Sequence, residues 1–94
     1  MRDGVIEAET VNTATDSTTV HTGRARLMGV YINTSLSAHT VIIKDGTTAK
    51  YTIPASAVAG QYFPFPGATF NTSLVVDPDN SSTGNITVEY IPVL

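Results

Sequence analysis

Only two side chains, His21 and His39, could act as a general base near neutral pH, and the chain has no cysteine. A serine nucleophile needs both a base and an orienting carboxylate close by. Asp16 and Ser17 lie near His21 in the sequence, but no G-x-S-x-G motif accompanies them. We therefore expect both histidines to be solvated on the surface. No catalytic residue is assigned, and the chain is not predicted to be an enzyme.

The segment that begins at Asp77 carries oxygen-bearing side chains that could bind calcium. Asp77 and Asp79 open it, but Pro78 interrupts the spacing and Glu89 is the thirteenth position. A calcium-binding EF-hand loop closes with a bidentate glutamate at the twelfth. A turn between two strands explains the same residue types. The sequence therefore predicts no metal and no cofactor.

Aromatic residues are concentrated in the segment Tyr62–Phe70, which holds four of the seven in the chain. Its prolines keep it extended and away from the centre of a sheet. The rings can plug one end of a β-sandwich, or some can lie on a subunit interface, where aromatic residues are enriched. Arg24 and Arg26 share one face of a strand and can contact an acidic partner or solvate the strand's open end. The candidate partner interface comprises Tyr62, Phe63, Phe65, Phe70, Arg24 and Arg26.

Charged residues make up 14% of the 94 positions, and the net charge is −3. An average soluble domain has roughly 25% charged residues. This composition argues against nucleic-acid binding, which relies on clustered lysine and arginine. No apolar run approaches the ~20 residues of a membrane span, and the start lacks the apolar core of a signal peptide. We expect neither nucleic acid nor membrane as a partner, and assembly in the cytoplasm.

The elements that must position these residues are all strands. β-branched and aromatic residues dominate, and turn signals recur at the spacing of a sandwich or barrel. Strands are expected over 5–11, 18–22, 24–33, 40–44, 48–53, 69–77 and 85–91, with a hairpin at Asp45-Gly46. The strand 24–33 ends in a run that is apolar on both faces, which predicts a central, covered strand. In the last strand, Ile86, Val88 and Tyr90 should point inward.

This pattern predicts an all-β chain, 1–94, that forms one small antiparallel β-sandwich or jelly roll of about seven or eight short strands. Residues 1–22 would form edge strands or an N-terminal arm. A domain of this size buries only roughly 60–70% of its unfolded surface. Without disulfides, a partner subunit is the natural supplement. A homo-oligomer is therefore expected.

Five segments in order carry a resemblance: Leu27-Met28-Gly29-Val30-Tyr31-Ile32-Asn33, Val41-Ile42-Ile43-Lys44-Asp45-Gly46, Tyr51-Thr52-Ile53-Pro54, Phe65-Pro66-Gly67-Ala68-Thr69-Phe70-Asn71-Thr72-Ser73-Leu74 and Gly84-Asn85-Ile86-Thr87-Val88-Glu89-Tyr90. Over residues 24–94 the chain resembles small tailed-phage virion structural proteins of the capsid decoration (cement) type. The likeness lies in hairpins and turns, without a signature motif. It implies a β-sandwich or jelly roll, commonly trimeric, located on the capsid surface where major capsid subunits meet.

The leading hypothesis is thus a non-enzymatic virion protein that binds at junctions between major capsid subunits and stabilises the shell. The alternative is a head-fibre, tail or adhesin-type virion module that binds a host surface glycan. Tyr62 or Tyr31, near asparagines, would then stack on a sugar. A bacterial β domain that acts as a generic interaction module is the third possibility.

Overall fold

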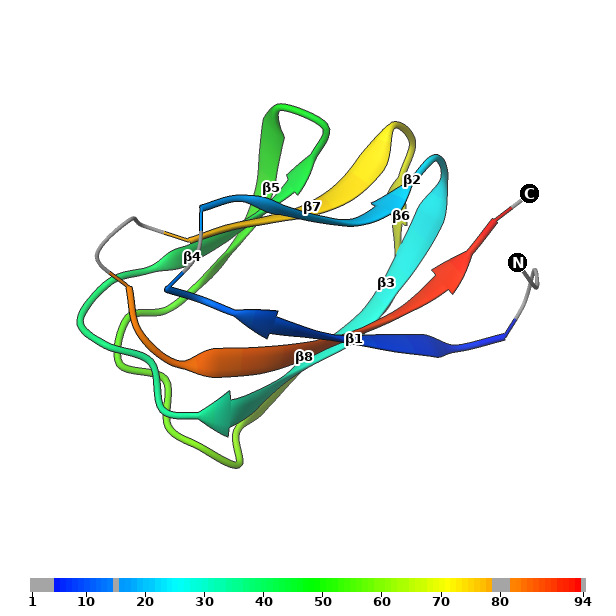
Figure 1. The fold of residues 1–94 in the computed structure, drawn as a ribbon. Coiled ribbons are helices and arrows are strands. Elements are labelled where there is room, and N and C mark those ends of the chain that lie inside the picture. Colours follow the sequence, from blue (N-terminus) through cyan, green and yellow to red (C-terminus); the bar gives the residue numbers. More distant parts are fainter. Residues whose placement is uncertain (1–4, 15, 79–81, 94) are drawn as a thin grey trace.

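The computed structural model describes residues 5–14, 16–78 and 82–93. Within these residues the chain forms eight strands in two four-stranded antiparallel sheets, packed as a sandwich (Figure 1). The strands are β1 (Glu7–Asn12), β2 (Thr18–Thr22), β3 (Ala25–Thr34), β4 (Val41–Asp45), β5 (Thr48–Ile53), β6 (Tyr62–Phe70), β7 (Ser73–Pro78) and β8 (Asn85–Pro92).

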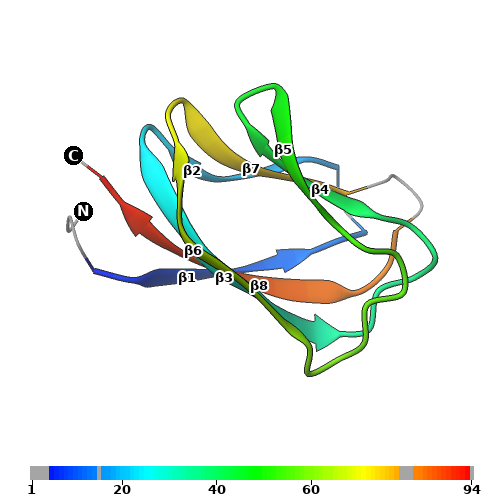
Figure 2. The same ribbon diagram turned by 180° about the vertical axis from the view of Figure 1, so that it is seen from behind.

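The strand order is that of a jelly roll. Sheet A has the order β1-β8-β3-β6, and sheet B has the order β2-β7-β4-β5 (Figures 1 and 2). The pairs β1–β8, β2–β7, β3–β6 and β4–β5 are all antiparallel, so the chain is one long hairpin rolled into two sheets. The predicted sandwich is confirmed. β1 and β2 are edge strands of the two sheets rather than an arm.

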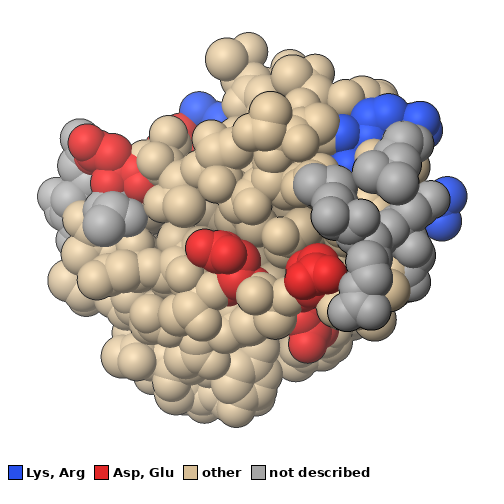
Figure 3. All heavy atoms as spheres, turned by 45° about the vertical axis from the view of Figure 1, so that its right-hand side comes forward, with Lys and Arg blue, Asp and Glu red and all other residues tan. Residues whose placement is uncertain are grey.

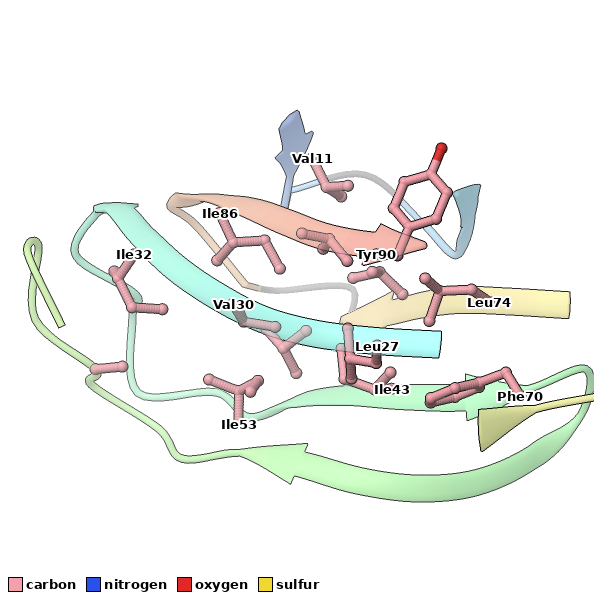
Figure 4. Close-up of a cluster of buried hydrophobic side chains, with 14 of the residues drawn as sticks. Val11, Leu27, Val30, Ile32, Ile43, Ile53, Phe70, Leu74, Ile86 and Tyr90 are labelled. Atoms are coloured by element: carbon pink, nitrogen blue, oxygen red, sulfur yellow. The ribbon is translucent and has the colours of Figure 1, made fainter. Parts of the chain in front are cut away.

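The core lies between the two sheets and is filled from both (Figure 4). β8 alternates as the sequence predicts, with Ile86, Val88 and Tyr90 buried between half-buried polar residues. The large side chains that are fully buried are Phe70, Leu27, Ile32, Ile43, Ile53, Leu74, Ile86, Val30, Val41, Val76 and Val88. One subunit thus encloses a continuous core, so the expected oligomer has to form through outer surfaces.

The strand predicted over 69–77 is wrong, because the chain turns within it. Phe70 ends β6 in sheet A, whereas Leu74 lies in β7 of sheet B. Both side chains are buried, so the apolar alternation continues across the turn although the sheet changes. The turn is held by Asp45, whose carboxylate accepts hydrogen bonds from the N–H groups of Asn71 (2.9 Å) and Thr72 (2.8 Å).

The histidine prediction is also wrong for His21, which is buried with its ring 5.7 Å from that of Tyr90. A β-bulge between Thr19 and His21 shifts the alternation of β2, so that His21 faces the core opposite Leu74. His39 is half-buried rather than fully solvated. Bulges are difficult to recognise from an alternation pattern, because one extra residue reverses the side to which all later side chains point.

β3 is central, as predicted, since it lies between β8 and β6. Its outer face is not covered, however, because Tyr31 remains 41% exposed. The apolar side chains of β3 therefore lie in the core on one face of the strand and on the molecular surface on the other. In the loop considered for calcium, Asp79, Asn80 and Ser81 lie outside the described residues.

Candidate functional surfaces

The described residues form no pocket. Uncharged residues cover most of the face shown in Figure 3, with acidic and basic residues in small separate groups. The large apolar side chains with the greatest exposure are Val5, Ile6, Tyr31, Tyr51, Val58 and Tyr62. Three of these are tyrosines, and they lie on two distinct surfaces.

The first surface, which we call the aromatic wall, consists of Tyr51, Phe63 and Phe65. It closes the side of the sandwich where β5 of sheet B and β6 of sheet A are the edge strands. The Tyr51 ring lies 4.8 Å from that of Phe65 and 6.4 Å from that of the buried Phe70, measured between centroids. Phe63 and Phe65 are half-buried against the core, and Tyr51 is 36% exposed. The wall therefore presents partly exposed aromatic rings that are packed against the core.

Proline shapes the backbone beside the aromatic wall. Pro64 and Pro66 both lie in β6, at the edge of sheet A. Proline has no N–H, so this edge cannot continue the ladder with a regular added strand. The register between β3 and β6 also shifts between Leu27 and Gly29, which further distorts the edge. A partner that contacts β6 would therefore meet side chains rather than a regular row of free N–H groups.

The second surface, which we call the tyrosine face, lies on the outside of sheet A and consists of Tyr31, Asn33, Tyr62, Asn85, Thr87 and Glu89. Three strands contribute to it: β8, β3 and β6. Tyr31 pairs with Thr87 on one side and with Tyr62 on the other. Tyr62 is 46% exposed, the larger exposure of the two tyrosines.

Tyr62 lies across β3 and reaches the next strand. Its hydroxyl donates a hydrogen bond to Oε1 of Glu89 (2.7 Å), which lies on β8, beyond β3. It crosses β3 at Gly29, which pairs with Glu89. A Cβ atom at Gly29 would overlap the Tyr62 ring and hydroxyl. The lack of a side chain at Gly29 thus allows the tyrosine to lie close against the sheet.

Asn33 organises the other half of the tyrosine face. Its Nδ2 donates to Oδ1 of Asn85 (2.6 Å) and to Oγ1 of Thr87 (2.7 Å). The register between β3 and β8 shifts between Ile32 and Thr34, so Asn33 occupies an irregular position facing β8. The amide, hydroxyl and phenol groups of this surface are therefore held in defined positions by neighbouring strands.

The residues predicted for a partner interface separate in the structure. Phe70 is completely buried, so the interface role expected for it is not possible in the folded subunit. Phe63 and Phe65 belong to the aromatic wall, and Tyr62 belongs to the tyrosine face. The charged candidates, Arg24 and Arg26, are exposed on either side of buried Ala25, and Arg26 lies beside Thr69 of β6.

Sequence reasoning missed Gly29, Asn33 and Glu89 as members of one surface. The alternation of β8 does place Glu89 outward, and that of β3 does place Tyr31 on the opposite side from the core. Neither pattern says that β8 and β3 are neighbours, which depends on pairing between distant segments. A glycine within an apolar strand was the one local signal, because such a glycine often marks the close approach of another group.

The Tyr62–Glu89 bond predicts an unusual titration. The bond, partial burial and the charge of Glu89 together raise the pKa of Tyr62 above its usual 10.0. Because the folded-state pKa is raised, the stabilisation is complete below pH 10 and is lost as the pH rises through the folded-state pKa. Glu89→Gln should return the Tyr62 pKa toward 10.0, as followed by phenolate absorbance.

Tyr62→Phe is the control for this titration, because burial, with smaller effects of Glu9 and Glu7, also raises the pKa of Tyr90. The difference between the wild-type and Tyr62→Phe curves isolates Tyr62. The same difference is taken in the Glu89→Gln background. If the Tyr62 pKa obtained there equalled that of the wild type, the hydrogen bond to Glu89 would not raise the pKa of the phenol.

Among the described residues, no helix has the length and apolarity needed to cross a membrane. These described residues also contain no cluster of three or more His, Cys, Asp or Glu side chains that could bind a metal ion. Comparison with protein-family models, with curated proteins and with solved structures finds no match for this chain.

Proposed function

We propose that this chain is a non-enzymatic virion structural protein, a capsid decoration subunit that binds at junctions between major capsid subunits. The observation that carries the proposal is the aromatic wall, a partly exposed aromatic surface that packs against the core beside an edge strand with two prolines. The virion setting rests on the resemblance described above. Viral capsid domains are among the proteins that use a jelly roll, which is an analogy at the level of the fold.

The aromatic wall has the character of a protein contact. Aromatic residues are enriched at protein interfaces, and charged residues are depleted from interface cores. Lys50 lies near the wall, with its Nζ 5.8 Å from the ring centroid of Phe70, the buried ring that Tyr51 approaches. The Tyr51 side chain is already held by its contact with Phe65, so little side-chain freedom is lost on binding.

A symmetric oligomer would strengthen such a contact. Several copies of the wall on one particle bind together, because each further contact with the shell is effectively intramolecular. Trimers would match positions at which shell subunits meet around a threefold axis. We therefore propose a homotrimer in solution, with the major capsid protein as its partner.

Co-sedimentation with shells tests this function. The purified protein is mixed with shells assembled from the major capsid protein encoded near its gene, or with the same capsid protein before assembly. We expect it to pellet with assembled shells only and to sediment as a trimer in analytical ultracentrifugation. Tyr51→Ala should weaken shell binding about tenfold or more, a loss within the range of an interface hot spot.

Tyr31→Ala is the matched control, since Tyr31 is similarly exposed but lies on the outer face of sheet A. It should leave shell binding unchanged. A monomer that remains in the supernatant with assembled shells, or a genome without a neighbouring capsid gene, would refute the proposed function.

A further inference from the structure

We propose that the tyrosine face binds an uncharged polysaccharide, with Tyr31 and Tyr62 stacking on successive sugar rings. This site is separate from the aromatic wall, and the inference goes beyond shell attachment. The observation that carries it is the combination of two exposed aromatic side chains with a hydrogen-bonded set of amide, hydroxyl and carboxylate groups on the outer face of one sheet.

The two tyrosines provide the stacking positions. They are paired across β3 and β6, but Tyr62 leans over Gly29 while Tyr31 lies two residues further along β3. The Tyr62 ring therefore covers sheet A at the level of Gly29, and Tyr31 lies at the next level along the strands. An aromatic face is electron-rich and attracts polarised C–H groups, which sugar rings present on their faces. Two platforms in sequence suit a chain of sugars better than a single small molecule.

The polar groups beside the tyrosines provide hydrogen bonds for hydroxyls. Asn33 uses its Nδ2 for Asn85 and Thr87, and Glu89 uses Oε1 for Tyr62. Within the described part of the chain, these bonds leave the Asn85 amide N–H groups and Oε2 of Glu89 for a ligand. Sugar hydroxyls both donate and accept hydrogen bonds, so they can pair with both groups. The internal bonds also fix the side chains before the ligand arrives, which reduces the entropy lost on binding.

The surroundings of the tyrosines favour sugar over protein as the ligand. The register places Thr10 and Asn12 of β1 beside Thr87 and Asn85, so that polar residues continue at the Asn33 end of the tyrosine face, whereas Ala8 lies beside Glu89. The core of a protein interface is mostly apolar, at about 65% of its area. Here Tyr31 stands beside small polar side chains instead, and the Tyr62 hydroxyl is bonded to a carboxylate. Glu89 is the member of the tyrosine face that is charged at neutral pH, and its negative charge disfavours an anionic polysaccharide.

A glycan array that carries neutral and acidic glycans tests the site with the full chain. We expect binding to neutral oligosaccharides of several sugars and none to acidic ones. Isothermal titration with the strongest neutral binder should then show a loss of about tenfold or more for Tyr62→Ala and for Tyr31→Ala. Gly29→Ala should also weaken binding, because the added methyl displaces the Tyr62 ring from its place on the sheet.

Tyr51→Ala is the matched control, since this tyrosine is exposed to a similar degree on the aromatic wall. It should bind sugar like the wild type. Circular dichroism of each variant confirms the fold, and Tyr31→Ala tests the site should Tyr62→Ala not fold.

An array without neutral binders, or an equal loss of binding in Tyr51→Ala, would overturn the proposal. So would a loss of shell binding, rather than sugar binding, in Tyr31→Ala and Tyr62→Ala, which would make the tyrosine face a protein interface. Failure of the array leaves the co-sedimentation result standing. The two proposals can therefore fail independently.

Discussion

Replacing Phe70 with alanine is expected to lower the free energy of unfolding by about 3–5 kcal/mol, the usual range for a buried phenylalanine. Phe70 is fully buried between the sheets, and the Tyr51 ring packs near it. Removing the ring leaves a cavity that the two sheets cannot close by moving together, because neighbouring core residues hold them apart. A loss of this size is a large part of the total stability of a small domain. Urea unfolding followed by circular dichroism measures it.

Thr69→Ala is the control for this prediction, because Thr69 is the exposed neighbour of Phe70 on the same strand. Its effect should lie within about 0.5 kcal/mol. If Phe70→Ala unfolded like the wild type but bound shells less well, the ring would belong to an interface and the position of β6 in this fold would be wrong.

Asp45 is expected to have the second largest effect, because it joins two turns of the molecule. It ends β4 at the β4–β5 hairpin, and its carboxylate accepts N–H bonds from Asn71 and Thr72, between β6 and β7, and from Ser73 at the start of β7. Asp45→Ala should lower the free energy of unfolding by about 1–3 kcal/mol, since these donors lose a charged acceptor and one of the bonds is partly buried. Chemical denaturation at pH 7 measures the loss.

The charge of Asp45 gives this prediction a pH dependence. The hydrogen bond from Asn71 is the largest of the effects that lower the pKa of Asp45 below its usual 3.8. Because the folded-state pKa is depressed, the stabilisation is present above pH 3.8 and is lost as the pH falls through the folded-state value. The difference in stability between the wild type and Asp45→Ala should therefore shrink below about pH 3.8. A difference that stays constant down to pH 2 would show that the charge does not matter.

The fold places the two proposed binding surfaces next to each other without merging them. Successive residues of β6 alternate between them, with Tyr62 on the outer face of sheet A and Phe63 against the core. Tyr51 belongs only to the aromatic wall, and Tyr31 belongs only to the tyrosine face. Reciprocal use of Tyr51→Ala and Tyr31→Ala in the shell and sugar experiments therefore assigns each function to one surface.

The amino-acid sequence by itself determined the parts of this fold that depend on neighbours in the chain. The alternation of Ile86, Val88 and Tyr90 predicted both β8 and its buried side, and the turn at Asp45-Gly46 predicted the β4–β5 hairpin. Side chains two residues apart in a strand must share a face, so such patterns can be interpreted locally. The strand predicted over 69–77 failed for the same reason. An inward alternation looks identical when a turn carries the chain from one sheet to the other.

Tertiary structure alone decided which distant segments meet, and therefore where the candidate surfaces lie. Strand order brings Tyr62 over Gly29 to Glu89 and brings Asp45 to the turn between β6 and β7. A bulge in β2 buries His21. Strand order follows from how the whole chain buries its apolar side chains at once, so no short segment contains that information. The sequence supplied the tyrosines and asparagines, and the rolling of the hairpin into two sheets brought them onto one face.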